Sequence, residues 1–186
     1  MINTTIEMNT LKSLMLFAGK KDIRSYLNGL HIEQSATGTL AVACNGHVIA
    51  VARIDSEAHE PASITIDRQY IDGIKSKYAV MFNQVDGATV SIKTENGTLT
   101  VPVVDARYPD WRRVVSARQT GERAYFDPDY AALVNKAGQT IRKSKLPYII
   151  QQNGDKPGYC NLNDIVHAYV MPMRAYYEEV VSSPTF

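Results

Sequence analysis

Apolar residues recur along the 186-residue chain at helical spacing in some stretches and at strand spacing in others. Between residues 11 and 18, leucine, methionine and phenylalanine fall on one face of a helix. Asn9 or Thr10 can cap this helix and Gly19 can end it. We therefore expect a helix from Asn9 to about Lys20.

Two stretches alternate apolar and polar residues around an Asn-Gly pair, the strongest short signal for a β-hairpin. Residues 39–54 (TLAVACNGHVIAVARI) predict two strands that turn at Asn45-Gly46. Residues 88–105 (ATVSIKTENGTLTVPVVD) predict a second pair that turns at Asn96-Gly97. Ahead of the first hairpin, the apolar positions of residues 26–32 indicate a further strand.

The same order of elements returns along the chain. Residues 63–78 predict a short strand that runs into a helix, and residues 123–145 predict a strand and then a helix that begins at Asp127-Pro128. Residues 148–174 predict strands around an Asn153-Gly154 turn. The chain thus contains about three copies of a unit made of a strand, a helix and antiparallel strands. This predicts an α+β fold with helices packed on antiparallel sheets.

Charge and composition narrow the classes of function. The formal net charge is +1, so contact with nucleic acid would depend on a local basic surface. Cys44 and Cys160 match no metal-binding spacing and read as free thiols in apolar strands, which fits a reducing cytoplasm. No signal-peptide pattern and no membrane-length apolar run is present, so we expect a cytoplasmic protein with no membrane partner.

The sequence contains no evident catalytic or metal-binding constellation. The four histidines have no ligand spacing, and no nucleophile–histidine set or phosphate-binding glycine loop stands out. We expect no enzyme activity, no metal and no cofactor. The unusual feature is the Met-Pro-Met-Arg end of residues 165–174, which is typical either of core filler or of an adaptable binding groove.

Four stretches, in the same order along the chain, together resemble one protein family. They are DIRSYLNGLHIE, LAVACNGHVIAVARI, DARYPDWRRVV and AYVMPMR. The family is the bacterial replicative sliding clamp, the β subunit of DNA polymerase III. Its protomer has three similar domains, and two protomers close a ring around duplex DNA. The resemblance implies a DNA-clamp-like fold of repeated strand-helix-strands units.

The resemblance also implies a shortened domain plan. Residues 1–116 resemble the complete middle domain, which consists of two half-repeats, and residues 117–122 form a linker. Residues 123–174 resemble only the second half of the last domain, and residues 175–186 form a C-terminal tail. The first domain and the front half of the last one have no counterpart in this sequence.

A half-domain leaves apolar surface in water, which is unfavourable by about 25 cal/mol for each Å². The same half from another chain can cover it in an isologous contact. We therefore expect a homodimer or a higher even oligomer through the third repeat. Much of the contact is expected from the helix face formed by Tyr130, Leu133, Val134 and Ile141.

In the family, partner proteins dock a short peptide between the middle and last domains. The resemblance places one wall of this groove on the Met-Pro-Met-Arg strand and the other around the Asn-Gly-His turn. Val48 replaces the usual basic residue, and Tyr169 replaces a smaller apolar one. The residues that match the groove are Leu27, Cys44, Gly46, His47, Val48, Ile49, Pro109, Arg113, Val114, Tyr169, Met171, Pro172, Met173 and Arg174.

Clamp helices line the hole of the ring and face DNA phosphates without reading bases. Basic residues on the three predicted helices match this role, although basic residues on a helix are also typical of an ordinary solvated face. The candidates that would face DNA are Lys12, Lys20, Lys21, Arg68, Lys75, Lys77, Arg142, Lys143 and Lys145.

These features predict a non-enzymatic, clamp-like protein of DNA replication or repair. Its expected partners are a DNA polymerase or another protein that carries a clamp-binding peptide, together with duplex DNA bound without sequence preference. Two alternatives stay open. One is a decoy that sequesters clamp-binding partners, and the other is a scaffold that keeps only the fold.

Overall fold

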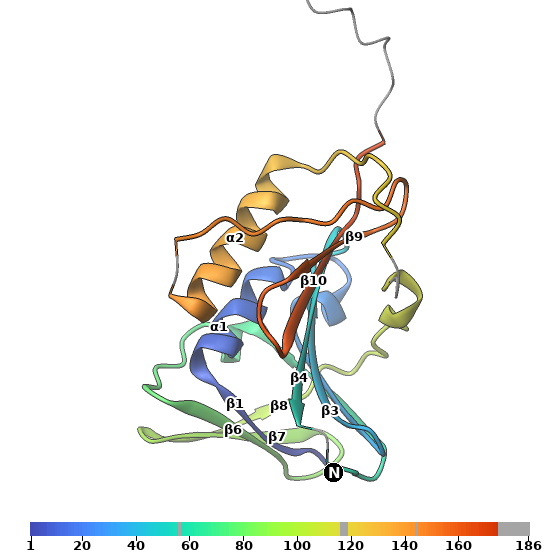
Figure 1. The fold of residues 1–186 in the computed structure, drawn as a ribbon. Coiled ribbons are helices and arrows are strands. Elements are labelled where there is room, and N and C mark those ends of the chain that lie inside the picture. Colours follow the sequence, from blue (N-terminus) through green and yellow to red (C-terminus); the bar gives the residue numbers. More distant parts are fainter. Residues whose placement is uncertain (56, 116–118, 144, 175–186) are drawn as a thin grey trace, which may run out of the picture.

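The computed structural model of the protein describes residues 1–55, 57–115, 119–143 and 145–174 (Figure 1). The α-helices are α1 (Met8–Phe17) and α2 (Pro128–Arg142), and 3-10 helices cover Ser25–Leu27, Arg68–Tyr70 and Trp111–Val114. The strands are β1 (Asn3–Glu7), β2 (Gly29–Ser35), β3 (Gly38–Cys44), β4 (Val48–Asp55), β5 (Ala62–Asp67), β6 (Ala79–Gln84), β7 (Thr89–Thr94), β8 (Gly97–Pro102), β9 (Gly158–Asn161) and β10 (Val166–Val170).

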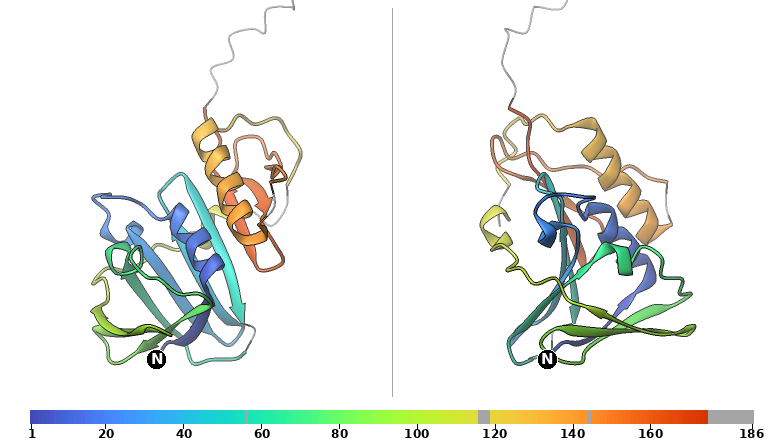
Figure 2. Two further views of the ribbon diagram at one scale, coloured as in Figure 1. Left: turned by 90° about the vertical axis from the view of Figure 1, so that its left-hand side faces the viewer. Right: turned by 180° about the vertical axis from the view of Figure 1, so that it is seen from behind.

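The strands form two antiparallel sheets. One has six strands in the order β5-β2-β3-β4-β10-β9, and the other has four in the order β1-β6-β7-β8. β10 pairs with β4 from Val170↔Val48 to Val166↔Ala52, so the third repeat extends the sheet of the first repeat. The two helices pack against each other on one face of this sheet (Figures 1 and 2).

Each half of residues 1–115 contributes its first strand to the sheet of the other half. β1 begins the first repeat but pairs with β6, and β5 begins the second repeat but pairs with β2. The two pairings share a register. Glu7, just before α1, lies opposite Ala79, and Asp67, just before the next 3-10 helix, lies opposite Gly29. Each half therefore covers a strand edge that the other would leave open.

The alternation in residues 39–54 sets the two faces of the six-stranded sheet. The alanines of β3 and β4, such as Ala41 and Ala50, are fully buried toward α1, where small side chains let the helix lie close. Val42 points to the opposite face and packs with Tyr108 and Trp111. The sheet therefore separates the helices from the segment 105–115 (Figure 2).

The structure corrects both ends of the first helix. α1 follows Glu7, whose side chain makes no capping bond, so neither predicted cap is used. The helix stops at Phe17 because Ala18 is extended, with φ −65° and ψ 140°. Gly19 does not close the helix; its N–H donates to the Leu27 carbonyl at 2.7 Å and ties the chain to the next segment.

The prediction of a helix within residues 63–78 is wrong. β5 runs into the 3-10 helix Arg68–Tyr70, where the Asp67 side chain accepts the N–H of Gln69 at 2.8 Å. The chain then leaves helical geometry around Gly73, a residue that disfavours helix interiors. A strand predicted ahead of α2 is also absent. β5 is a strand because it pairs with the opposite half of its domain, and residues 123–126 have no such half in the described chain.

Other elements follow the prediction closely. α2 begins at Pro128, and the Asp127 side chain accepts the N–H of Asp129, as expected for an Asp-Pro start. The first hairpin turns at Gly46-His47, one residue later than predicted, because the Asn45 N–H donates to the Val48 carbonyl at 3.2 Å. The second turns one residue earlier than predicted, at Glu95-Asn96, because Gly97 already pairs with Thr94.

The prediction of an α+β fold with helices on antiparallel sheets is confirmed. None of the helices described has the length and apolar run that a membrane span requires.

We expect Gly29→Ala to destabilise the protein by about 1–3 kcal/mol, because the added methyl group would collide with the Ile66 carbonyl and separate β2 from β5. Urea unfolding followed by circular dichroism measures the change. Gly73→Ala is the matched control, because nothing lies within 4 Å of the methyl group that it adds. Equal unfolding midpoints for the two variants would contradict the account of the interlocked halves.

Candidate functional site

A groove of about 300 Å³ lies over the line where β4 of the first repeat meets β10 of the third. It is on the sheet face opposite the helices. Most of its lining is apolar, and the lining comes from five segments that are separate in sequence. The lining residues are Arg24, Tyr26, Leu27, Cys44, Gly46, His47, Val48, Ile49, Tyr108, Pro109, Asp110, Trp111, Val114, Pro157, Tyr169 and Met171.

The floor of the groove follows from strand register. Ile49 of β4 lies between Cys44 of β3 and Tyr169 of β10, because it is the pairing partner of both. All three point away from the helices. Burial raises the pKa of the Cys44 thiol and of the Tyr169 hydroxyl, so both stay neutral at ordinary pH. The floor is therefore uncharged.

The segment 105–115 forms one wall, and aromatic side chains hold it on the sheet. Tyr108 stacks on His31 with ring centroids 4.1 Å apart and planes 6° apart. Trp111 is 8% exposed and packs on the same cluster. Arg112 lies over the Trp111 ring at 4.4 Å and pairs with Glu33 of β2. These contacts position Pro109, Asp110 and Val114 along the groove.

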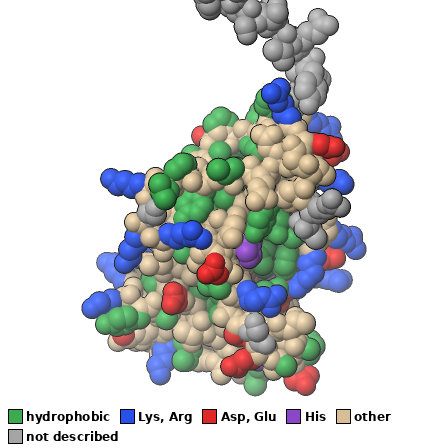
Figure 3. Space-filling view, viewed as in Figure 1, with side chains coloured by type: hydrophobic (Ala, Val, Ile, Leu, Met, Phe, Trp, Pro, Cys, Tyr) green, Lys and Arg blue, Asp and Glu red, His purple; other side chains and the backbone are tan. Residues whose placement is uncertain are grey.

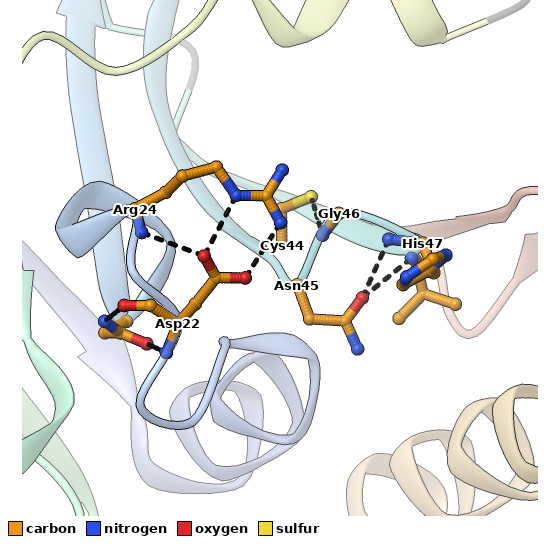
Figure 4. Close-up of polar contacts among 8 residues, drawn as sticks. Asp22, Arg24, Cys44, Asn45, Gly46 and His47 are labelled. Atoms are coloured by element: carbon orange, nitrogen blue, oxygen red, sulfur yellow. Dashed lines mark hydrogen bonds and ion pairs between the residues drawn. The ribbon is translucent and has the colours of Figure 1, made fainter.

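The β3–β4 turn forms the opposite wall (Figure 4). The Asn45 side chain accepts the N–H groups of His47 at 2.9 Å and Val48 at 3.0 Å. Gly46 has φ +95°, and a Cβ there would lie 2.8 Å from an Arg24 nitrogen, so the turn requires glycine. The His47 carbonyl accepts the N–H of Met171 at 2.8 Å, which brings the C-terminal strand to the turn.

Arg24 places its guanidinium beside Gly46 of this turn. Its side chain donates to both carboxylate oxygens of Asp22, at 2.9 and 2.8 Å. These bonds lower the pKa of Asp22 to about 2. Arg24 is therefore held in place above Gly46 (Figure 4), where its charge borders an otherwise apolar groove.

The structure brings together most of the predicted groove residues. Leu27, Cys44, Gly46, His47, Val48, Ile49, Pro109, Val114, Tyr169 and Met171 all line the same groove. Arg113 does not line it; its side chain is exposed and pairs with Asp110 at 3.2 Å. Pro172, Met173 and Arg174 line a neighbouring hollow of about 690 Å³ formed with residues 122–125 and 154–155.

The prediction missed several residues that line the groove. They are Arg24, Tyr26, Tyr108, Asp110, Trp111 and Pro157. Tyr108 and Trp111 lie within the YPDWRR motif, so their aromatic character was the available signal. Nothing local in the sequence marks Pro157, which reaches the groove through the turn before β9.

The basic residues predicted to face DNA do not form one helical surface. Lys12 is exposed on α1, and Lys75 and Lys77 lie beyond the 3-10 helix. Arg68 is held within the chain, where it donates to the Ala18 and Gly19 carbonyls at 2.9 and 2.8 Å and pairs with Asp72. The remaining candidates, Lys20, Lys21, Arg142, Lys143 and Lys145, are exposed.

In the part of the chain that the structure describes, His, Cys, Asp and Glu side chains do not gather in threes as metal ligands would. Cys44 and Cys160 are free thiols.

Interlocked half-domains, with helices on one sheet face and a groove on the other, define the architecture of a DNA sliding clamp. Solved structures of bacterial clamps share this fold. The Pseudomonas aeruginosa sliding clamp aligns with a TM-score of 0.67 and 16% identity over 94% of this chain and 66% of its own. The DNA polymerase III β subunit of Thermotoga maritima gives a TM-score of 0.67 at 17% identity, over the same shares of both chains.

Sequence comparison also finds β sliding clamps, from other bacteria. The β sliding clamp of Salmonella typhimurium is 28% identical over 126 residues, which cover 61% of this chain and 34% of the clamp. That of Proteus mirabilis is 28% identical over 131 residues, covering 64% of this chain and 35% of the clamp. No protein-family profile matches the chain. The chain thus spans about a third of the curated relatives it matches, and its resemblance to the bacterial β sliding clamp is confirmed.

We expect acid to loosen the wall formed by the segment 105–115. Burial favours the neutral form of Glu33, but bonds from His31 and Arg112 outweigh it and lower its pKa from 4.5 to about 2. The unfolded chain therefore binds a proton more readily. The stability that Glu33 contributes is fully present above pH 4.5 and is lost as the pH falls to about 2.

Glu33→Gln should accordingly flatten the decline in unfolding free energy over this pH window, as measured by urea titrations at several pH values. Glu60→Gln, an exposed glutamate in a loop, is the control. An unchanged pH profile for Glu33→Gln would show that the carboxylate does not anchor the wall.

Proposed function

We propose that the protein is a non-enzymatic, clamp-like factor of DNA replication or repair that binds short peptides of polymerase-type partners in the groove described above. The observation that carries this proposal is the groove itself, whose uncharged floor runs across the β4–β10 pairing and is bordered by Arg24 and His47. Similarity to β sliding clamps over 61% of the chain supports the choice of partner class.

The groove suits an extended peptide with apolar and aromatic anchors. Leu27, Ile49 and Met171 offer apolar contact, and Met171 can adapt to different side chains because its thioether chain is flexible. Polar groups at the rim, such as Arg24, fix the orientation of the peptide by hydrogen bonds. We expect micromolar affinity, about −8 kcal/mol or weaker, as for small transient interfaces.

Duplex DNA is the second partner that we propose. Arg142, Lys143 and Lys145 form the densest basic cluster and are exposed at the end of α2. Contacts of this kind neutralise phosphates and carry no sequence preference. We also propose that the chain associates with itself through its third repeat, by the contact developed in the next subsection.

We expect Met171→Glu to weaken binding of a fluorescent peptide that carries apolar and aromatic anchors by tenfold or more, measured by anisotropy, because it buries a carboxylate against the apolar floor. Met173→Glu should have a smaller effect, since Met173 lies in the neighbouring hollow.

The matched control is Met81→Glu. Met81 is 37% exposed, close to the 40% of Met171, but lies on β6 of the other sheet. Absence of saturable binding by the wild type, or equal affinity of the two variants, would refute the groove as a peptide site.

For DNA, we expect replacement of Arg142, Lys143 and Lys145 by glutamine to reduce the slope of log affinity against log salt by about 0.9 for each phosphate that the variant no longer neutralises. Electrophoretic shift or anisotropy with a random duplex measures this slope. The control replaces three exposed basic residues outside the candidate set, Lys93, Arg107 and Lys156. An equal slope for wild type and the first variant would remove the end of α2 from the DNA-facing surface.

A further inference from the structure

The third repeat contains a counterpart of β5 that is already in position. Residues 122–127 precede α2 as β5 precedes its 3-10 helix, and Asp127 caps α2 as Asp67 caps that helix. In the middle of β5, the Thr65 carbonyl accepts the N–H of Val104 at 2.8 Å. The Tyr125 carbonyl accepts the N–H of Met173 at 2.7 Å in the same way. The two segments therefore have equivalent places in their repeats.

The third repeat also contains a counterpart of β6. A Lys-Ser-Lys sequence precedes β6 at residues 75–77 and recurs at 143–145. Asn83 of β6 pairs with Ser91, and Gln151 forms the equivalent bridge with Tyr159. Residues 147–152 therefore correspond to β6.

Burial follows the same alternation in both segments. Val80 and Phe82 of β6 are buried, and Tyr148 and Ile150 are the partly buried residues of residues 147–152. The residues between them, Met81 in β6 and Ile149 in residues 147–152, are exposed.

In residues 1–115, the first strand of each half pairs with the strand that follows the helix of the other half. β1 pairs with β6, and β5 pairs with β2. In the third repeat, side-chain amides hold the corresponding edges instead. Asn135 accepts the N–H of Tyr148 at 2.8 Å, and Gln152 accepts the N–H of Ala124 at 3.3 Å. A second half that would supply backbone partners is not among the described residues.

Large apolar side chains lie beside these edges. Ile149 is 81% exposed and Leu146 is 73% exposed, whereas Met81, which occupies the position of Ile149 in β6, is 37% exposed. Figure 3 shows hydrophobic side chains gathered over α2 and the segment in front of it. The surface is thus apolar where the equivalent surface of the complete domain is shielded by the other half.

We propose that two copies of the chain pair reciprocally through these edges. Residues 123–126 of each copy lie against residues 148–151 of the other, so that two half-domains build one complete domain around a two-fold axis. The register is set by the two pairings within the chain, Glu7↔Ala79 and Asp67↔Gly29. It places Tyr125 opposite Ile149 of the partner subunit and Phe126 opposite Tyr148 of the partner subunit.

A second copy fits this surface better than an unrelated strand for two reasons. The contact is self-complementary, since each copy supplies one strand of either kind and both open edges are closed at once. The charges also match. Asp127 and Asp129 at the start of α2 fall at the end of the pairing where Lys143 and Lys145 of the partner subunit lie. The amide bonds of Asn135 and Gln152 are exchanged for backbone bonds.

The register also identifies the closest side chains. Opposite residues in an antiparallel sheet alternate between hydrogen-bonded and non-hydrogen-bonded pairs. The Met8 N–H donates to the Tyr78 carbonyl, and the Arg68 N–H donates to the Asn28 carbonyl, so both of these pairs are hydrogen-bonded. Counting along the strands from them, Thr5↔Met81 and Thr65↔His31 are non-hydrogen-bonded pairs. Tyr125 and Ile149 of the partner subunit occupy the equivalent pair, where Cα atoms lie about 4.5 Å apart. That separation is within the range of a disulfide.

The helix face expected from the sequence to form this contact is largely used within the single chain. Val134 is fully buried, and Tyr130, Leu133 and Ile141 pack on the core within one chain. The proposed contact therefore uses the strand edges rather than the apolar face of α2.

Cross-linking between differently tagged full-length chains tests the register. One chain carries Tyr125→Cys and the other carries Ile149→Cys, and both retain Cys44 and Cys160. After mild oxidation, the mixture should give a disulfide-linked heterodimer well above the wild-type background, whereas each variant alone should not. Tyr125→Cys mixed with Leu99→Cys is the control, because Leu99 is 50% exposed but lies on β8. Equal cross-linking of the control pair, or none in the test pair, would overturn the proposal.

Sedimentation and native mass spectrometry test the assembly independently of peptide binding. The wild type should be dimeric or a higher even oligomer at micromolar concentration, and Ile149→Lys should dissociate it at least tenfold more readily. Leu99→Lys should not. Unchanged circular dichroism and melting of Ile149→Lys would show that the fold is retained. A monomeric wild type, or a dimer indifferent to Ile149→Lys, would refute this pairing while leaving the peptide groove untouched.

Discussion

The antiparallel pairing of β10 with β4 is the interaction on which the rest of the structure depends. It joins the third repeat to the first, and it sets Tyr169 beside Ile49 on the groove floor. Continuation of the same pairing brings the N–H of Met171 to the His47 carbonyl. On the opposite face of β10, Ala168 is fully buried, and α2 packs against this strand. A shift of one residue would exchange the two faces and remove both features.

The wall of the groove is held differently from its floor. The floor is a hydrogen-bonded sheet, but the segment 105–115 is attached mainly through the rings of Tyr108 and Trp111 and the Arg112–Glu33 pair. Side-chain attachment of this kind permits small movements of the wall without breaking the sheet. A groove with a hydrogen-bonded floor and a side-chain-anchored wall would suit the proposed peptide ligands if they differ in side-chain size.

The sequence predicted those features that local chemistry determines. The hairpin near Asn45-Gly46, the alternation of residues 39–54 and the Asp127-Pro128 helix start require only neighbouring residues, and all three are present. The groove was predictable in part because its motifs resemble a known family. Pro157 was not, since it reaches the groove through tertiary packing that no local pattern encodes. The failed helix in residues 63–78 shows that a helical apolar spacing is a weak signal when glycine interrupts it.

The absent strand at residues 123–126 shows a different limit. β5 and residues 122–127 have equivalent places and make equivalent bonds to the end of their repeats, yet only β5 is a strand. The difference lies in what stands on the other edge, because β5 has β2 beside it. Strand formation is therefore a property of a pair of segments and not of one sequence. In the described chain the edge groups of Tyr148 and Ala124 are held instead by the side chains of Asn135 and Gln152, which the dimer proposed above would replace with backbone partners.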